Sequence, residues 1–200
     1  LPAKESQLVK PVELKVRYRE GLLDPNRLSL KILTDFQKTL GSRGFAGQYG
    51  QDPAPDEGGI IKPEWFDIVR PETLRRDVNL EPIHFFIDSA YTEKTENDPT
   101  AILTCYRSGN FIYILDVQEV WLEFPQLIQW LLNYTQRFQY HQQNSKIFIE
   151  PKASGKSIAQ QLRVVSMLNI VEMEAPKDDK VTRAHGVSPT LEGRRVKLID

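Results

Sequence analysis

The chain has almost no cysteine, little histidine and no long apolar run, and each shortage excludes a class of function. One cysteine in 200 residues cannot form an internal disulfide, so nothing favours a secreted, oxidising environment. No apolar run approaches the ~18–20 residues that a membrane span needs. The three histidines, His84, His141 and His185, are scattered without the spacing of a zinc site. We therefore expect neither a membrane protein nor a zinc site.

The chain also lacks a strong charge of either sign. Its formal net charge is −1 at pH 7, so a nucleic-acid partner would have to be met by a local basic patch. Residues 51–150 carry most of the acidic side chains, between two mildly basic flanks. This acidic middle indicates either a set of solvated loops or a functional acidic site. The hydrophobic fraction of 40% is enough for a folded core.

Signals for nucleotide binding and for covalent catalysis are missing too. Gly155, Lys156 and Ser157 resemble the end of a phosphate-binding loop, but that loop needs a glycine five positions before Gly155, where Glu150 stands. No convincing Cys–His or Ser–His–Asp set occurs. An enzyme built on this chain would therefore need another source of a nucleophile.

The first third of the sequence is mixed and polar. It opens without a methionine or a signal-peptide pattern, so we expect a piece of a longer protein. Helical spacing of apolar residues, with Pro25 at the start, predicts a helix over roughly 25–40. Gly41 and Gly44 are expected past its end. Residues 47–63 are rich in Gly, Pro and Asp, which marks a linker.

Short apolar runs and amphipathic stretches begin at residue 83, after an irregular segment expected over 64–82. The predicted strands are 83–88, 101–106, 111–120, 146–150, 170–173 and 194–199, and the predicted helices are 124–138, 154–168 and 178–186. Ser108, Gly109 and Asn110 predict a hairpin turn between the second and third strands. A β-meander followed by alternating helices and strands implies an α/β fold with a mixed sheet covered by helices.

Acidic residues follow several of the predicted strands. Asp88 ends the first strand, Glu150 ends the fourth, and Asp178 and Asp179 follow the fifth at the start of a helix. If the first and fourth strands are neighbours, Asp88 and Glu150 lie side by side, and a divalent cation relieves their repulsion. Oxygen-only ligands suit Mg²⁺ or Mn²⁺. Two such ions can hydrolyse a phosphodiester without a protein nucleophile.

Each of these residues also has a structural explanation. A single Asp at a strand end is more often a cap or a loop residue, and Glu150 could be the last exposed residue of its strand. Asp178 and Asp179 form a natural helix N-cap. Their order on successive strand ends is what favours a metal site.

Basic residues cluster in sequence around the acidic ones, where they would bind the DNA backbone or simply belong to an ordinary charged surface. They are Lys152, Lys156, Lys180, Arg183, Arg194 and Arg195. His84 is expected to be a core or supporting residue, and His185 lies near the third acidic position in sequence.

These segments resemble the nuclease motifs of tailed-bacteriophage terminase large subunits. The first motif is matched by residues 86–92 (FIDSAYT) and 97–101 (NDPTA), the second by 149–155 (IEPKASG) and the third by 177–184 (KDDKVTRA). Residues 44–53 (GFAGQYGQDP) and 58–62 (GGIIK) resemble the segment that joins the packaging ATPase to the nuclease. The resemblance spans about residues 20–190.

The resemblance implies a ribonuclease H-like fold over 64–200, with part of the nuclease expected beyond the C-terminus, and an ATPase tail and linker over 1–63. It implies an endonuclease that cleaves concatemeric double-stranded viral DNA during genome packaging. Two Mg²⁺ or Mn²⁺ ions would bind Asp88, Glu150 and Asp179, with Asp178 available to the second ion. DNA-binding roles fall to Lys152, Lys156, Lys180 and Arg183.

The same resemblance implies a cellular setting. The expected partners are double-stranded DNA, the portal protein and the small terminase subunit, in the cytoplasm of an infected or prophage-carrying bacterium. Two alternatives remain open at this point. One is another ribonuclease H-like enzyme, such as a transposase or a resolvase, although the linker motif at 44–62 argues against it. The other is a non-catalytic module that docks on the portal or the small subunit.

Overall fold

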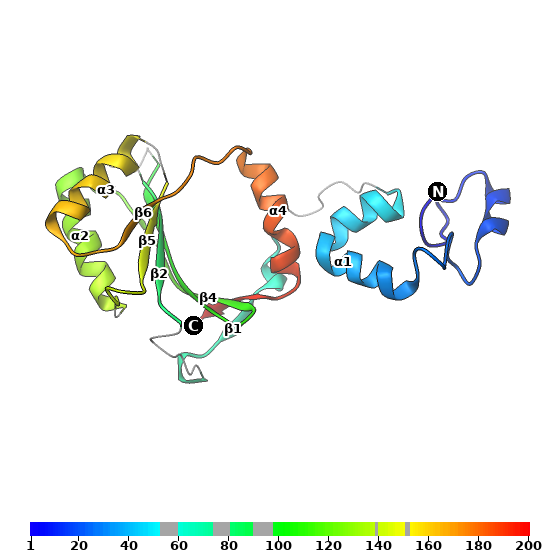
Figure 1. Ribbon diagram of the computed structural model, residues 1–200, viewed down its shortest axis with the longest axis horizontal. Helices are drawn as coiled ribbons and strands as arrows, with labels where there is room; N and C mark the ends of the chain where they lie inside the picture. The colour runs from blue at the N-terminus through cyan, green and yellow to red at the C-terminus, as the bar shows by residue number, and fades with distance from the viewer. Residues whose placement is uncertain (53–59, 74–80, 90–97, 139, 151–152) are drawn as a thin grey trace. The chain divides into compact units, whose positions relative to one another are not determined.

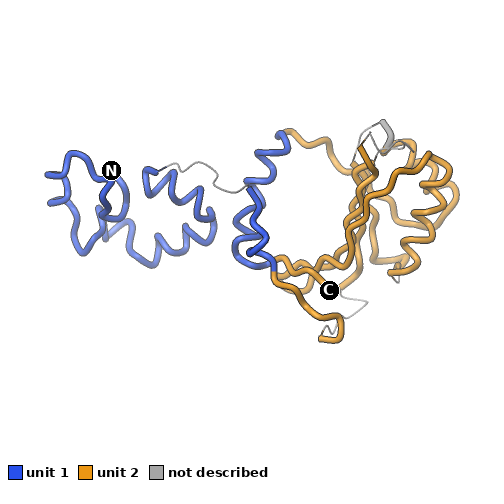
Figure 2. The backbone as a smooth tube through the Cα atoms, turned by 180° about the vertical axis from the view of Figure 1, so that it is seen from behind, with its two compact units in different colours: residues 1–66, 178–195 blue, residues 67–177, 196–200 orange. Residues whose placement is uncertain are grey.

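The chain is divided into two compact units in a computed structural model that describes residues 1–52, 60–73, 81–89, 98–138, 140–150 and 153–200. The first unit holds residues 1–66 and 178–195, and the second holds 67–177 and 196–200 (Figure 2). The predicted division at residue 63 stays a prediction. No helix of the described residues is both long enough and apolar enough to cross a membrane.

The second unit contains a seven-stranded mixed sheet. Its strands are β1 (Asp67–Val69), β2 (His84–Asp88), β3 (Thr100–Ser108), β4 (Phe111–Val120), β5 (Lys146–Ile149), β6 (Ile170–Glu172) and β7 (Val196–Ile199). Their order in the sheet is β1-β7-β4-β3-β2-β5-β6. β3 is antiparallel to both of its neighbours, and all the other adjacent strands are parallel. The predicted α/β class with a mixed sheet is confirmed.

Two helices, α2 (Phe124–Arg137) and α3 (Ala153–Val165), cover one face of this sheet (Figure 1). The strands alternate accordingly: Phe85 and Ile87 of β2 are buried, while its other residues, His84, Phe86 and Asp88, are half-buried. The buried strand residues form one core with the apolar faces of the two helices. That core includes Phe85, Ile87, Leu127, Leu131, Ile147, Ile149, Ile158 and Leu162.

A buried polar contact holds α2 to the hairpin of β3 and β4. The Tyr134 hydroxyl lies 2.6 Å from Thr104 Oγ1 and donates to Asp116 Oδ2 at 2.9 Å. Burial raises the pKa of Tyr134. Thr104 pairs with Asp116, whereas the next residue, Cys105, pairs with Ile114. Leu115 is therefore the extra residue of a β-bulge, and the Tyr134 hydroxyl lies at that bulge.

The first unit contains α1 (Leu30–Phe45) and α4 (Lys180–Glu192), with short helical turns at η1 (Val12–Arg17), η2 (Ala46–Gly50) and η3 (Pro63–Trp65). Gly41 interrupts α1 with φ +70°, and there the carboxylate of Glu192 accepts hydrogen bonds from the backbone N–H and the hydroxyl of Ser42. This contact joins α1 to the end of α4.

Several predicted boundaries were wrong. The helix expected over 25–40 begins at Leu30, because Ser29 rather than Pro25 starts it: the Ser29 hydroxyl accepts from the Ile32 N–H. Its predicted end is met by the break at Gly41, after which a second helical stretch, which includes Gly44, continues to Phe45. Residues 64–82 were expected to be irregular, yet β1 forms there by pairing with β7. A further short turn, η4 (Pro71–Thr73), follows β1.

Candidate active site

Two carboxylates lie at the ends of neighbouring strands in the second unit. β2 and β5 are parallel, and their register pairs Phe86 with Phe148 and Ile87 with Ile149. The next residues in step are Asp88 and Glu150. The Glu150 N–H donates to the Ile87 carbonyl at 3.1 Å, which extends the pairing by one residue beyond β5. β2 and β5 are therefore neighbours, as the predicted pairing of Asp88 with Glu150 requires.

Strand alternation places both carboxylates on the same face of the sheet. Ile87 and Ile149 point into the core beneath α2 and α3, so Asp88 and Glu150, one residue further on, point to the opposite face. Adjacent strands are about 4.8 Å apart, which puts the two acidic residues next to each other. Both are half-buried, and Oε2 of Glu150 is a buried atom.

Aromatic residues lie beside the acidic pair on that face. The rings of Phe86 and Phe148 stack with centroids 4.8 Å apart. His84 contacts the edge of Phe148 at 5.8 Å, and its Nδ1 accepts a hydrogen bond from the Lys146 N–H at 3.2 Å. Burial and the nearby Lys146 charge lower the pKa of His84. His84 lies four positions before Asp88, on the same face of β2, and its supporting role stays a prediction.

A third acidic residue occupies the same row of the sheet. Asp88 pairs with Ala101 on β3, and Ala101 pairs with Glu119 on β4. Glu119 is exposed, about 10 Å away from Asp88 across two strand spacings. Sequence reasoning missed it, because the register set by the hairpin turn alone would place Gln118 there. The bulge at Leu115 shifts the pairing by one residue and brings in Glu119 instead.

The predicted third motif has a clear local role in the first unit. Asp179 is the N-cap of α4: its Oδ1 accepts from the Thr182 N–H at 2.9 Å and its Oδ2 from the Thr182 hydroxyl at 2.8 Å. These hydrogen bonds lower the pKa of Asp179. Asp178, just before it, is exposed. The assignment of these two residues as metal ligands stays a prediction.

The basic residues differ in what the structure shows of them. Lys156 is exposed in the first turn of α3, and Lys180 and Arg183 are exposed in the first turn of α4. Lys152 lies outside the described residues. His185, on α4, contacts the Arg43 guanidinium, with its Nε2 3.0 Å from Nη1.

The residues at the strand ends fit a hard cation in their chemistry. Two adjacent carboxylates supply oxygen donors only, the ligands preferred by Mg²⁺ and Mn²⁺. Among the residues that the structure describes, no three His, Cys, Asp or Glu side chains gather closely enough to bind one metal ion. Within the described residues, the candidate metal site therefore consists of two carboxylates, to which a third ligand would be added.

No family model and no curated protein matches the sequence, but solved structures do. The large terminase of a thermophilic bacteriophage, in complex with ATP-gamma-S, aligns with a TM-score of 0.63 at 16% identity, covering 94% of this chain and 48% of that one. Its complex with ADP gives a TM-score of 0.61 at 15% identity and the same coverage. The chain shares the fold of these large terminases. It spans about half their length.

A further match is the Mn-bound nuclease domain of the large terminase of bacteriophage SPP1. It has a TM-score of 0.42 at 16% identity and covers 67% of this chain and 71% of that one.

Within the sheet, the five central strands run in the order β4-β3-β2-β5-β6, an antiparallel meander extended by two parallel strands. This order and these strand directions agree with the predicted ribonuclease H-like fold.

Proposed function

We propose that the chain is the nuclease part of a tailed-bacteriophage terminase large subunit, a Mg²⁺- or Mn²⁺-dependent endonuclease that cleaves concatemeric double-stranded DNA during genome packaging. The observation that carries the proposal is the in-step placement of Asp88 and Glu150 on adjacent parallel strands. The shared fold of the large terminases supports it. The motif resemblance over three segments of the sequence points to the same activity.

In this proposal Asp88 and Glu150 are the central metal ligands. Asp179 is the third, and Asp178 is available to a second ion. When bound by these carboxylates, two divalent cations would supply a water that is nucleophilic at neutral pH and would stabilise charge on the leaving oxygen. The chain itself contributes the carboxylates, which hold the ions against their mutual repulsion.

The DNA backbone is bound by basic side chains that lie near the acidic residues in the sequence. Lys156, Lys180 and Arg183 are exposed and positively charged, as contacts to phosphate require. Lys152 is assigned the same role on its place in the sequence. The portal protein, the small terminase subunit and the cytoplasm of the infected host belong to this proposal as the setting of the full-length terminase.

Nicking of supercoiled plasmid DNA tests the proposal. With Mn²⁺ the wild-type chain should convert supercoiled plasmid to open circles, and chelation by EDTA should stop it. Asp88→Asn should reduce nicking to the EDTA background, because an amide is neutral and a poor ligand for a hard cation. Asp35→Asn is the matched control, since Asp35 is exposed on α1 in the other unit.

Undiminished nicking by Asp88→Asn would refute the assignment. If Asp35→Asn lost nicking activity to the same extent, the loss would reflect a general effect of replacing an Asp by Asn and not the removal of a metal ligand. A preference for branched over linear duplex DNA would favour the resolvase alternative instead.

A further inference from the structure

Helix α3 meets the end of β5 at a glycine. A Cβ added to Gly155 would overlap the Glu150 carbonyl oxygen and would lie 3.0 Å from Ile149 Cγ2 and 3.2 Å from Ser89 Oγ. A carbonyl oxygen belongs to the backbone and cannot rotate away like a flexible side chain. The absence of a side chain at Gly155 therefore permits a contact that no other residue could make without moving either α3 or the main chain of Glu150.

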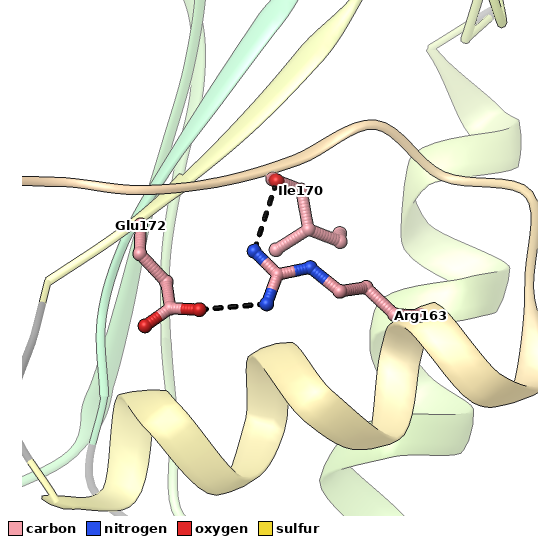
Figure 3. Close-up of polar contacts among 3 residues, drawn as sticks. All are labelled: Arg163, Ile170 and Glu172. Atoms are coloured by element: carbon pink, nitrogen blue, oxygen red, sulfur yellow. Dashed lines mark hydrogen bonds and ion pairs between the residues drawn. The ribbon is translucent and has the colours of Figure 1, made fainter.

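The rest of α3 is fixed to the sheet, so the helix cannot simply lift away. The Arg163 guanidinium donates to Glu172 Oε1 at 2.6 Å and to the Ile170 carbonyl at 3.3 Å, which ties the second half of α3 to β6 (Figure 3). Three further α3 residues are completely buried in the core; they are Ile158, Ala159 and Leu162. Strain introduced at Gly155 would therefore fall on the first turn of α3 and on the strand end beside it.

That strand end carries the carboxylate of the proposed site. The main chain of Glu150 lies between two contacts: its N–H donates to the Ile87 carbonyl at 3.1 Å, and its carbonyl lies against Gly155. These contacts fix the backbone from which the Glu150 side chain projects. Ser89, which is 5% exposed and directly follows Asp88, also lies beside Gly155, with its Oγ 3.2 Å from the position of an added Cβ. The same glycine thus borders the ends of both acidic strands.

We propose that Gly155 is a positioning residue: its contact with the Glu150 main chain keeps the Glu150 carboxylate in step with Asp88. The consequence for metal binding rests on the proposed function, whereas the effect on the Glu150 main chain does not. Gly155 belongs to the Gly155-Lys156-Ser157 segment, which resembles the end of a phosphate-binding loop. Its role in this proposal is to position the Glu150 main chain.

The test compares Gly155→Ala with Gly186→Ala in the full chain. Gly186 is exposed on α4, and a Cβ added there meets nothing within 4 Å, so the control makes the same chemical change in open space. Hydrogen exchange of the Glu150 amide is followed by NMR without metal. We expect Gly155→Ala to lower its protection about tenfold or more, because the Glu150–Ile87 hydrogen bond is displaced.

A second measurement titrates Mn²⁺ against melting temperature. We expect the midpoint concentration to rise about 10–100-fold in Gly155→Ala, as for loss of a group that orients a metal ligand. Gly186→Ala should change neither readout. Unchanged Glu150 protection in Gly155→Ala would overturn the proposal, whatever happens to stability.

A milder variant covers the case in which Gly155→Ala fails to fold. Ser89→Thr keeps the hydroxyl and adds one methyl group to a buried side chain beside Gly155, so it should lower Glu150 protection in the same direction; no change would overturn the proposal. If Glu150 protection falls but the wild type itself shows no response to Mn²⁺, the positioning role stands and the proposed nuclease function fails.

Discussion

The two acidic regions of the molecule have the same residue types but different surroundings. Asp179 is explained by the helix that it starts, because both of its carboxylate oxygens accept hydrogen bonds from Thr182. Asp88 and Glu150 lie in step on adjacent parallel strands, and neither β2 nor β5 needs an acidic residue for its own backbone pairing. An acidic residue after a strand can therefore be assigned to a site only when its neighbour in space is known. The local sequence does not show that neighbour.

The largest expected difference between the two regions is in metal binding. We expect Mn²⁺ at a hundredfold excess over its dissociation constant to stabilise the folded chain by about 2.7 kcal/mol. That corresponds to a rise in melting temperature of about 5–10 °C for a chain of this size. Glu150→Gln should abolish this rise, because it removes one of the two central ligands.

Asp178→Asn and Asp179→Asn sharpen the same comparison. As variants of the proposed third ligand, they should reduce the Mn²⁺-induced rise without abolishing it. Differential scanning fluorimetry across a Mn²⁺ titration measures both effects. The proposed roles of the two regions would be reversed if Glu150→Gln kept the full Mn²⁺-induced rise in melting temperature and Asp179→Asn lost it.

A smaller effect separates the regions by pH. Hydrogen bonds from Thr182 lower the pKa of Asp179, so its contribution to stability is present above its unfolded-state pKa of about 4 and is lost as the pH falls through the lower folded-state pKa. Asp179→Asn keeps a capping side chain without the charge. Its melting temperature should therefore lie below the wild-type value at neutral pH and approach it below about pH 4. A difference that is constant from pH 7 to pH 3 would contradict the charge assignment.

Much of the fold could be predicted because its signals are local. Apolar runs marked β2 and β5, and the turn at Gly109 fixed the β3–β4 hairpin, where Gly109 has φ +56°. β1 could not be predicted, since its three residues pair with β7, more than a hundred residues away. The contact between Glu192 and the break at Gly41 in α1 could not be predicted either, because local periodicity does not show long-range contacts.

The candidate site was predictable to a similar extent. Asp88 and Glu150 were found from their positions at strand ends, given the single assumption that their strands are neighbours. Glu119 was missed because a bulge at Leu115, beside Tyr134, shifts the register by one residue. Gly155 was noticed for the wrong reason, since its importance lies in the atoms that an added side chain would overlap.

The central claim is tested most directly by a crystal of the chain soaked in Mn²⁺ and measured for anomalous scattering. We predict anomalous density between the carboxylates of Asp88 and Glu150, with a second ion about 4 Å from the first. Ordered carboxylates at both positions with no anomalous density between them, at Mn²⁺ concentrations that support nicking, would contradict it.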